Sequence, residues 1–172
     1  SGMYTPPPAI ALFSRILKDD GFEVALFDTT DYKIGNDFDS DKEKEKHLAV
    51  RPFDMTDKVT LKNTDPYDDL DKLVNFFHPD LVAMSATEDT FHLGLRLIKY
   101  IDKYDILTIV GGVFPTFAPQ KVIKNKEIDI VCVGEGEDAL LELCVKLRES
   151  KDYSNIENLW IKKESGEVIK NP

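Results

Sequence analysis

The sequence predicts an α/β fold with a doubly wound, mostly parallel sheet, and three observations support that prediction. Helical and strand patterns alternate along the chain from Pro66 onward. The strand segments are short, apolar and rich in valine and isoleucine, as expected when helices cover both faces of a parallel sheet. Polar or glycine-rich motifs follow three strands, and ligands of doubly wound folds bind at the carboxyl ends of the strands. The predicted class is therefore flavodoxin-like or Rossmann-like.

The first predicted unit is a helix, a glycine stop and a strand. Pro6, Pro7 and Pro8 mark an extended start, and apolar residues then recur at helical spacing as far as Leu17. Asp20-Gly21 ends this helix, and the apolar segment Phe22 to Phe27 predicts a strand.

Residues 29–66 differ from the rest of the chain. They are polar and contain the charge run DSDKEKEK at 39–46. Charge runs are usually solvated, which favours a long polar insertion. A lid over a ligand is the functional alternative.

Regular patterns return after this insertion. The predicted elements are a helix at 67–77, a strand at 81–84, a helix at 91–104, a strand at 106–110, a short helix at 119–124, a strand at 128–133, a helix at 138–148 and a hairpin of 159–162 with 167–169. We therefore expect one domain over residues 3–150, with the 29–66 insertion, followed by a hairpin linker at 151–172.

Composition excludes several classes of function. Among 172 residues, 22 are basic and 32 acidic, which gives a net charge of −10 and disfavours binding to nucleic acids or anionic membranes. No apolar run approaches the roughly 18–20 residues of a membrane span, and no signal peptide is visible. Cys132 and Cys144 are too few for a disulfide scaffold or a zinc framework. These features predict a cytoplasmic protein.

The first motif, Ser85-Ala86-Thr87, follows a buried strand. Two hydroxyls at the end of a strand would donate hydrogen bonds to a polar ligand. Alternatively, the motif caps the helix that begins near Phe91, because serine and threonine are favoured N-cap residues. The motif alone leaves both interpretations open.

The second motif, Gly111-Gly112-Val113-Phe114-Pro115-Thr116, ends the next strand. Its glycines remove side chains where a ligand must approach the backbone closely, although an ordinary glycine-rich turn is the alternative. It matches neither a P-loop nor the G-x-G-x-x-G dinucleotide pattern. If the glycines serve a ligand, a bulky residue at Gly112 should block binding and leave the fold intact.

The third motif, Gly134-Glu135-Gly136-Glu137, ends a strand and opens a helix. Glu137 falls in the first helical turn, where an acidic side chain suits the helix dipole. Glu135 is less easily explained as a turn residue, and the glycines again leave room for a flat or bulky ligand. The histidines, at positions 47, 78 and 92, show no metal-ligand spacing, and no catalytic arrangement is present.

Together the three motifs resemble the cobalamin (vitamin B12)-binding domain that lies N-terminal to radical S-adenosylmethionine (SAM) domains. Gly111 follows Ser85 by about 26 residues, and Gly134 follows Gly111 by about 23. Each motif is weak alone, but the combination is specific. The resemblance covers roughly residues 5–150, and the hairpin at 159–170 resembles the segment that leads to the radical SAM barrel.

The resemblance implies a Rossmann-like fold with cobalamin at the carboxyl ends of the strands and its nucleotide tail in a slot beside the sheet. The implied cofactor-binding residues come from all three motifs. Ser85 and Thr87 would flank the slot, and Gly111 and Gly112 would let the tail pass close to the backbone. The loop beside it would be shaped by Val113, Phe114, Pro115 and Thr116, and the far side bounded by Gly134, Glu135 and Gly136.

The chain departs from related domains at two points. The Asp-x-His-x-x-Gly motif, whose histidine ligates cobalt in methionine-synthase-type domains, is absent, and Asp31 to Gly35 only echoes it. The resemblance therefore implies base-off cobalamin without a histidine ligand. Relatives also carry a strand before the segment that corresponds to Pro6–Pro8, so we expect the sheet to lack that strand or to fill its place otherwise.

The resemblance implies a cofactor-binding module, and two cysteines cannot hold the three-cysteine [4Fe-4S] cluster of radical SAM enzymes. SAM, the cluster and a radical reaction such as methyl transfer would belong to a radical SAM domain of the same parent chain. A degenerate scaffold or interaction domain that no longer binds cobalamin is the alternative, and a homodimer is left open. A flavodoxin-like FMN protein is disfavoured, because no hydroxyl-rich phosphate loop is present.

Overall fold

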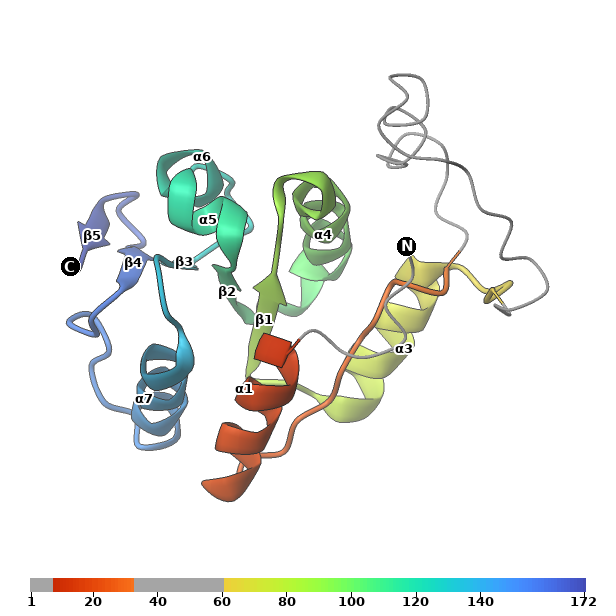
Figure 1. Ribbon diagram of the computed structural model, residues 1–172, viewed down its shortest axis with the longest axis horizontal. Coiled ribbons are helices and arrows are strands. Elements are labelled where there is room, and N and C mark those ends of the chain that lie inside the picture. Colours follow the sequence, from red (N-terminus) through yellow and green to blue (C-terminus); the bar gives the residue numbers. More distant parts are fainter. Residues whose placement is uncertain (1–7, 33–60) are drawn as a thin grey trace.

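The computed structural model describes residues 8–32 and 61–172, so most of the predicted insertion lies outside the described residues. The described part is an α/β structure around a five-stranded sheet of order β1-β2-β3-β4-β5 (Figure 1). None of its helices is both long enough and apolar enough to cross a membrane.

The sheet is parallel in its first half and antiparallel in its second. β1 (Leu81–Ser85), β2 (Leu107–Gly111) and β3 (Ile130–Cys132) run parallel. β4 (Leu159–Lys162) and β5 (Val168–Lys170) form the predicted hairpin, and β4 pairs with β3 in antiparallel orientation. The predicted fold class is confirmed, and the parallel strands bring the three motif loops to one edge.

Helices cover both faces of the sheet. In Figure 1, α4 (Glu88–Ile101), α5 (Val113–Phe117) and α6 (Pro119–Ile123) lie above the strands, whereas α1 (Pro8–Asp19) and α7 (Glu137–Arg148) lie below. α3 (Pro66–Phe77) packs against α4, which continues into a 3₁₀ turn, η2 (Asp102–Tyr104).

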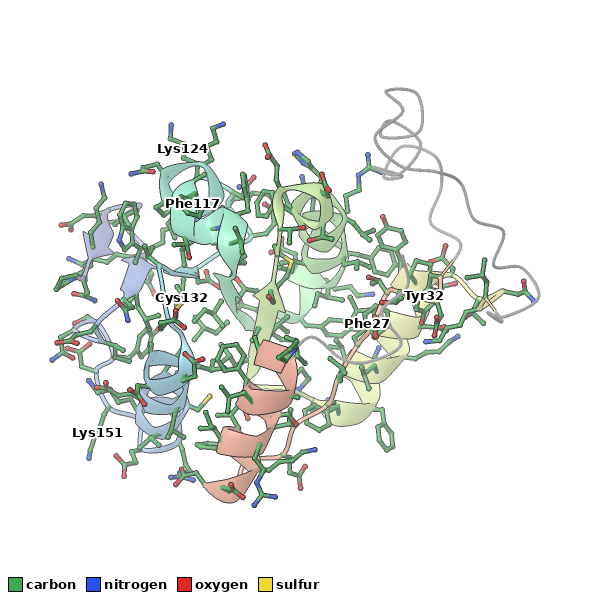
Figure 2. The ribbon with its side chains drawn as sticks, viewed as in Figure 1. Phe27, Tyr32, Phe117, Lys124, Cys132 and Lys151 are labelled. Carbon is green, nitrogen blue, oxygen red and sulfur yellow. The ribbon has the colours of Figure 1, made fainter. Side chains whose placement is uncertain are left out.

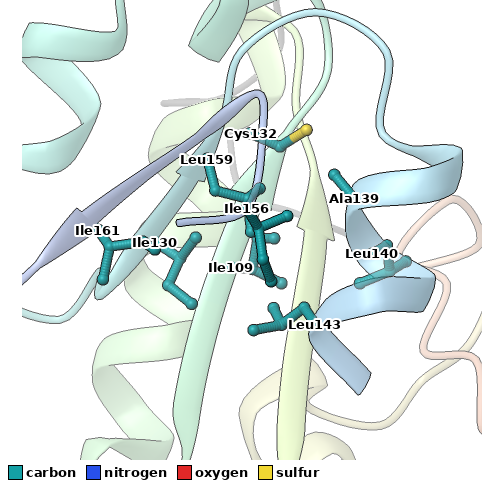
Figure 3. Packing of buried hydrophobic residues seen from close by; sticks show 9 residues of the cluster. All are labelled: Ile109, Ile130, Cys132, Ala139, Leu140, Leu143, Ile156, Leu159 and Ile161. Atoms are coloured by element: carbon teal, nitrogen blue, oxygen red, sulfur yellow. The ribbon is translucent and has the colours of Figure 1, made fainter. Parts of the chain in front are cut away.

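Strand residues divide between two cores according to the two-residue period of a strand. Ile109 and Ile130 face α7, in the cluster that Figure 3 shows with Leu140 and Leu143. Their neighbours Val110 and Val131 belong to the opposite cluster, beneath α4 and α6. A third cluster joins α3 to α4. Burial on both faces accounts for the continuous apolar strands of the sequence.

The strand predicted over Phe22 to Phe27 is wrong. The segment is extended but forms no strand with the described residues, and Leu26 is 56 % exposed. Phe27 packs instead beside α3, with its ring centroid 5.7 Å from that of Tyr32 (Figure 2). The apolar residues of this segment therefore reflect packing against α3. The local sequence predicted a strand wrongly because it does not show whether a neighbouring strand is available for pairing.

Two smaller differences concern helices. α4 begins at Glu88, three residues before the predicted start, and α5 forms a turn of helix ahead of the predicted helix at 119–124. α4 begins directly after the first motif, whereas α5 begins inside the second motif, so the residues from Val113 to Thr116, expected to shape a loop, form a turn of helix.

The amino-terminal edge of the sheet holds a polar network. The Thr108 hydroxyl lies 2.8 Å from Glu127 O and 2.9 Å from Asp129 Oδ2, and it accepts a hydrogen bond from the Asp129 N–H at 3.1 Å. The Glu127 side chain is 4 % exposed and pairs with Lys99 at 3.3 Å. Lys162 Nζ donates to Asn125 O at 2.6 Å and to Ile128 O at 2.5 Å. These contacts fix the loop between α6 and β3.

Candidate functional site

The first two motif loops are joined by their backbones at the carboxyl edge of the sheet. Ser85 and Gly111 are register partners at the ends of β1 and β2. Beyond them, the Ala86 N–H donates to Gly111 O at 2.9 Å and the Phe114 N–H donates to Ala86 O at 3.3 Å. These bonds hold Ser85-Ala86-Thr87 directly against the Gly-Gly turn.

Thr116 joins the second loop to the third. Its hydroxyl donates to Gly112 O at 2.9 Å and accepts from the Gly134 N–H at 3.1 Å. The side chain of Asn158, which precedes β4, donates to Glu135 O at 3.2 Å. The structure thus brings all three predicted loops together, and it adds Asn158, which no sequence motif singled out because it follows the third loop by more than twenty residues.

Gly112 has a structural role that the sequence did not reveal. Its φ is 105°, and a Cβ there would lie 2.7 Å from Ala86 O and 3.2 Å from Ser85 Oγ. A side chain would therefore strain the backbone and displace the first loop. The expectation that a bulky residue at Gly112 would leave the fold intact is inconsistent with this geometry.

Gly111 is the glycine that leaves room at the sheet edge. A Cβ on Gly111 would meet only Cys132 Cβ, at an ordinary contact distance of 3.5 Å. In the third loop, a Cβ on Gly134 would have nothing closer than Asn158 Oδ1, at 4.0 Å. Gly111 therefore tolerates a side chain. At Gly134 the φ of 95° would strain any side chain, so the backbone conformation favours glycine there despite the open space.

Hydroxyl and carboxyl groups at this edge divide into capping groups and groups without such a role. Thr87 is the N-cap of α4, and its N–H donates to Thr90 Oγ1 at 2.9 Å, which confirms the capping interpretation for this residue. Glu137 lies in the first turn of α7, as predicted. Neither the Ser85 hydroxyl nor the Glu135 carboxylate donates or accepts a hydrogen bond with another described residue.

The residues of this edge lie within the region that a family model matches. Residues 53–144, more than half of the chain, match the model of the B12 binding domain. The chain belongs to the B12-binding domain family. All three motif loops fall inside the match, at the carboxyl edge where ligands of such folds bind.

Known proteins similar to this B12-binding domain are larger enzymes. An uncharacterized methyltransferase of Pyrococcus horikoshii is 28 % identical over 62 % of this chain and 24 % of its own length. The radical S-adenosylmethionine methyltransferase TsrM of Kitasatospora setae superposes with a TM-score of 0.69 at 20 % identity, over 98 % of this chain and 28 % of that chain. A second TsrM structure, with cobalamin and a [4Fe-4S] cluster bound, gives 0.63. The chain spans about a quarter of the length of these relatives.

The side chain beneath the loops of the B12-binding domain is a neutral thiol. Cys132, at the end of β3, has its Sγ 3.7 Å from Glu135 O (Figures 2 and 3). Burial, with the nearby Glu137 and Glu135 carboxylates, raises the pKa of Cys132 to about 11. The Cys132 side chain is therefore uncharged at neutral pH. Among residues 8–32 and 61–172, no cluster of side chains could hold a metal ion.

The carboxyl edge combines open backbone positions, polar side chains and a neutral thiol. Gly111 and Gly134 leave the backbone accessible, Ser85 and Glu135 offer polar groups, and Cys132 supplies a neutral floor. A cavity of about 340 Å³ opens between α4 and α6, with Phe91 and Phe114 on its wall. His92 lines this cavity, and His78 ends α3 on the opposite edge, so neither belongs to the three loops.

Proposed function

We propose that this chain holds cobalamin against the carboxyl edge of its sheet, in the base-off form and without a histidine ligand from this chain. The observation that supports it most directly is the joining of the three loops by Thr116 and the Ala86 backbone, within residues that match the B12-binding family. The two histidines of the described region lie outside those loops.

In this proposal the residues have distinct roles. The Gly111 backbone admits the cofactor closely, the Ser85 hydroxyl and Glu135 carboxylate bind its polar groups, and Thr116 keeps the second and third loops at a fixed spacing. Bound cobalamin would supply a cobalt centre able to carry a methyl group, while the protein supplies binding and orientation.

The proposed partner is a radical SAM domain in the same parent chain. The chain spans about a quarter of the similar methyltransferases, and a TsrM structure contains both cobalamin and a [4Fe-4S] cluster. We propose that SAM and the cluster belong to that domain, because Cys132 and Cys144 are buried or half-buried neutral thiols. Methyl transfer is the proposed reaction of the parent enzyme.

Two matched threonines test the cofactor site. Thr116 joins two loops at the carboxyl edge, and Thr108 joins β2 to the loop before β3 at the amino edge, through hydrogen bonds of similar length. Titration of the purified chain with hydroxocobalamin, followed by its absorption spectrum, should show base-off binding. Thr116→Val should weaken that binding about tenfold, a loss of about 1.4 kcal/mol, whereas Thr108→Val should leave the affinity unchanged.

The same titration separates the proposal from its alternatives. A spectrum of histidine-ligated cobalamin would contradict the base-off assignment. No binding at high micromolar cobalamin would favour a scaffold that has kept the fold and lost the cofactor. Equal weakening by both threonine variants would show that affinity follows general stability and not the carboxyl edge.

A further inference from the structure

The short helix α5 carries two large apolar side chains that the fold leaves in solvent. Val113 is 63 % exposed and Phe117 is 84 % exposed (Figure 2). They lie four residues apart, on one face of the helix, whereas Pro115 is fully buried on the other. Phe114 lines the cavity between α4 and α6. We call the apolar surface formed by Val113, Phe117 and the Phe114 wall of this cavity the α5 face.

The surroundings of the α5 face are basic, although the chain as a whole is acidic. Residues 111–125 include Lys121 and Lys124 and no acidic residue, in a chain with a net charge of −10. Neither lysine forms an ion pair with another described residue. Glu88 lines the cavity on the α4 side, so the basic character is confined to α5 and α6. Apolar side chains beside unpaired lysines fit a protein surface that is apolar with acidic residues around it.

The last residue of the chain lies at the same edge of the fold as the start of α5. The Pro172 carbonyl accepts a hydrogen bond from the Asn158 N–H at 2.7 Å. The Asn158 side chain donates to Glu135 O at 3.2 Å, in the third motif loop. In that same loop, the Gly134 N–H donates to the Thr116 hydroxyl of α5 at 3.1 Å. Polypeptide that continues after Pro172 would therefore leave the fold beside a loop that is hydrogen-bonded to α5.

We propose that the α5 face docks the radical SAM domain of the parent enzyme, through an apolar patch of that domain with acidic residues at its rim. This inference rests on the proposed function. About three quarters of the length of the similar methyltransferases lies outside the region that this chain matches, which is ample for such a domain. Because the connection would start next to α5, the domain would be held at a high effective concentration, and a small interface suffices.

Lys121 is a suitable position at which to detect docking. It is exposed and lines the cavity together with Phe114. A single charge at the rim of an interface contributes little to affinity, so Lys121→Cys should leave docking in place. The introduced thiol is followed by its reaction with N-ethylmaleimide and mass spectrometry. Cys132 and Cys144 react slowly at neutral pH, because burial raises the pKa of each to about 11.

Phe76 provides a matched control for Phe117. Both lie on helices and are exposed to 85 % and 84 %, but Phe76 lies near the end of α3. In the full-length parent enzyme, the thiol of Lys121→Cys should react about tenfold more slowly than in this chain alone. Adding Phe117→Ser to the parent enzyme should restore the faster reaction, whereas adding Phe76→Ser should not. Circular dichroism of each variant verifies that the fold is retained.

The outcomes distinguish the docking surface from the cofactor site. Equal reaction rates in the parent enzyme and in this chain would overturn docking, and a parent enzyme that still binds hydroxocobalamin would leave the proposed function standing. Slowing of the reaction in this chain alone, by hydroxocobalamin or at high chain concentration, would also overturn docking, because the cofactor or a second copy would then cover the face. Slowing that depends on Phe117, in a parent enzyme that binds no cobalamin, would support docking and overturn the proposed function.

Discussion

The two edges of this sheet are both polar, but they use polar residues differently. At the amino edge, Thr108 bonds to Asp129 and to the Glu127 carbonyl, and Lys162 donates to backbone carbonyls of the same loop. The Glu127 carboxylate pairs with Lys99. At the carboxyl edge, three loops are joined through backbone groups and one hydroxyl, that of Thr116. Polar side chains at the first edge bind other groups of the protein, whereas the Ser85 hydroxyl and the Glu135 carboxylate at the second edge make no hydrogen bond with another described residue.

The pKa values of buried groups also differ between the two edges. Burial acts to raise the pKa of Glu127, but its own backbone N–H and the Lys99 ammonium outweigh burial and hold that pKa below its ordinary value. Burial lowers the pKa of Lys162. At the carboxyl edge, the buried group is a neutral thiol. A charge at the amino edge therefore meets a partner from the protein itself, which is typical of a structural network rather than a ligand site.

The largest expected change in stability comes from substitution of Gly112, and its neighbour Gly111 should behave differently. Gly112→Ala should lower the free energy of unfolding by about 2–4 kcal/mol, because it combines a positive φ with a contact at 2.7 Å to Ala86 O. Gly111→Ala should change that free energy by less than about 1 kcal/mol, yet weaken cobalamin binding. Urea denaturation and a cobalamin titration measure the two effects. Equal stability losses would remove the distinction between a glycine needed by the turn and one available to a ligand.

The amino edge should show the opposite behaviour. Thr108→Val leaves the Asp129 N–H and carboxylate without their hydroxyl partner, at a cost of about 1–3 kcal/mol in stability. Cobalamin affinity should not change. If affinity fell together with stability, the two edges would be energetically coupled, and the comparison between them would fail.

A smaller effect should appear at high pH through Cys132. The folded-state pKa of about 11 exceeds the ordinary value of 9.0, so the unfolded chain loses its proton first as the pH rises. Stability contributed by the protonated thiol is complete below pH 9 and is lost between about pH 9 and 11, by about 1 kcal/mol from pH 8 to pH 10. Cys132→Ala should reduce this slope in urea denaturation. An identical slope in the variant would show that the thiol is not held neutral by the fold.

The sequence predicted most of the strands and the position of the candidate site, for a physical reason. Continuous apolar runs mark strands covered on both faces, and the parallel arrangement then brings their following loops to one edge. Ser85, Gly111 and Gly134 could be placed there from their positions after strands alone. The family resemblance, carried by the combination of loops, was confirmed by the match to residues 53–144.

Other features depend on contacts between distant segments and could not be read locally. Phe22 to Phe27 has the composition of a strand but no neighbour with which to pair in the described region. The positive φ of Gly112 follows from its fit against Ala86, and Phe13 meets Gly136 across more than 120 residues of chain.

Mapping of bound cobalamin on the folded chain is the most direct test of the carboxyl edge as the cofactor site. In ¹H–¹⁵N NMR spectra, base-off hydroxocobalamin should shift the amides of 85–87, 111–114, 116 and 134–137. The amides of 102–108 and 125–129, at the amino edge, should stay in place. Shifts centred on the amino edge, or on the wall of the α4–α6 cavity alone, would contradict the assignment of the carboxyl edge as the cofactor site.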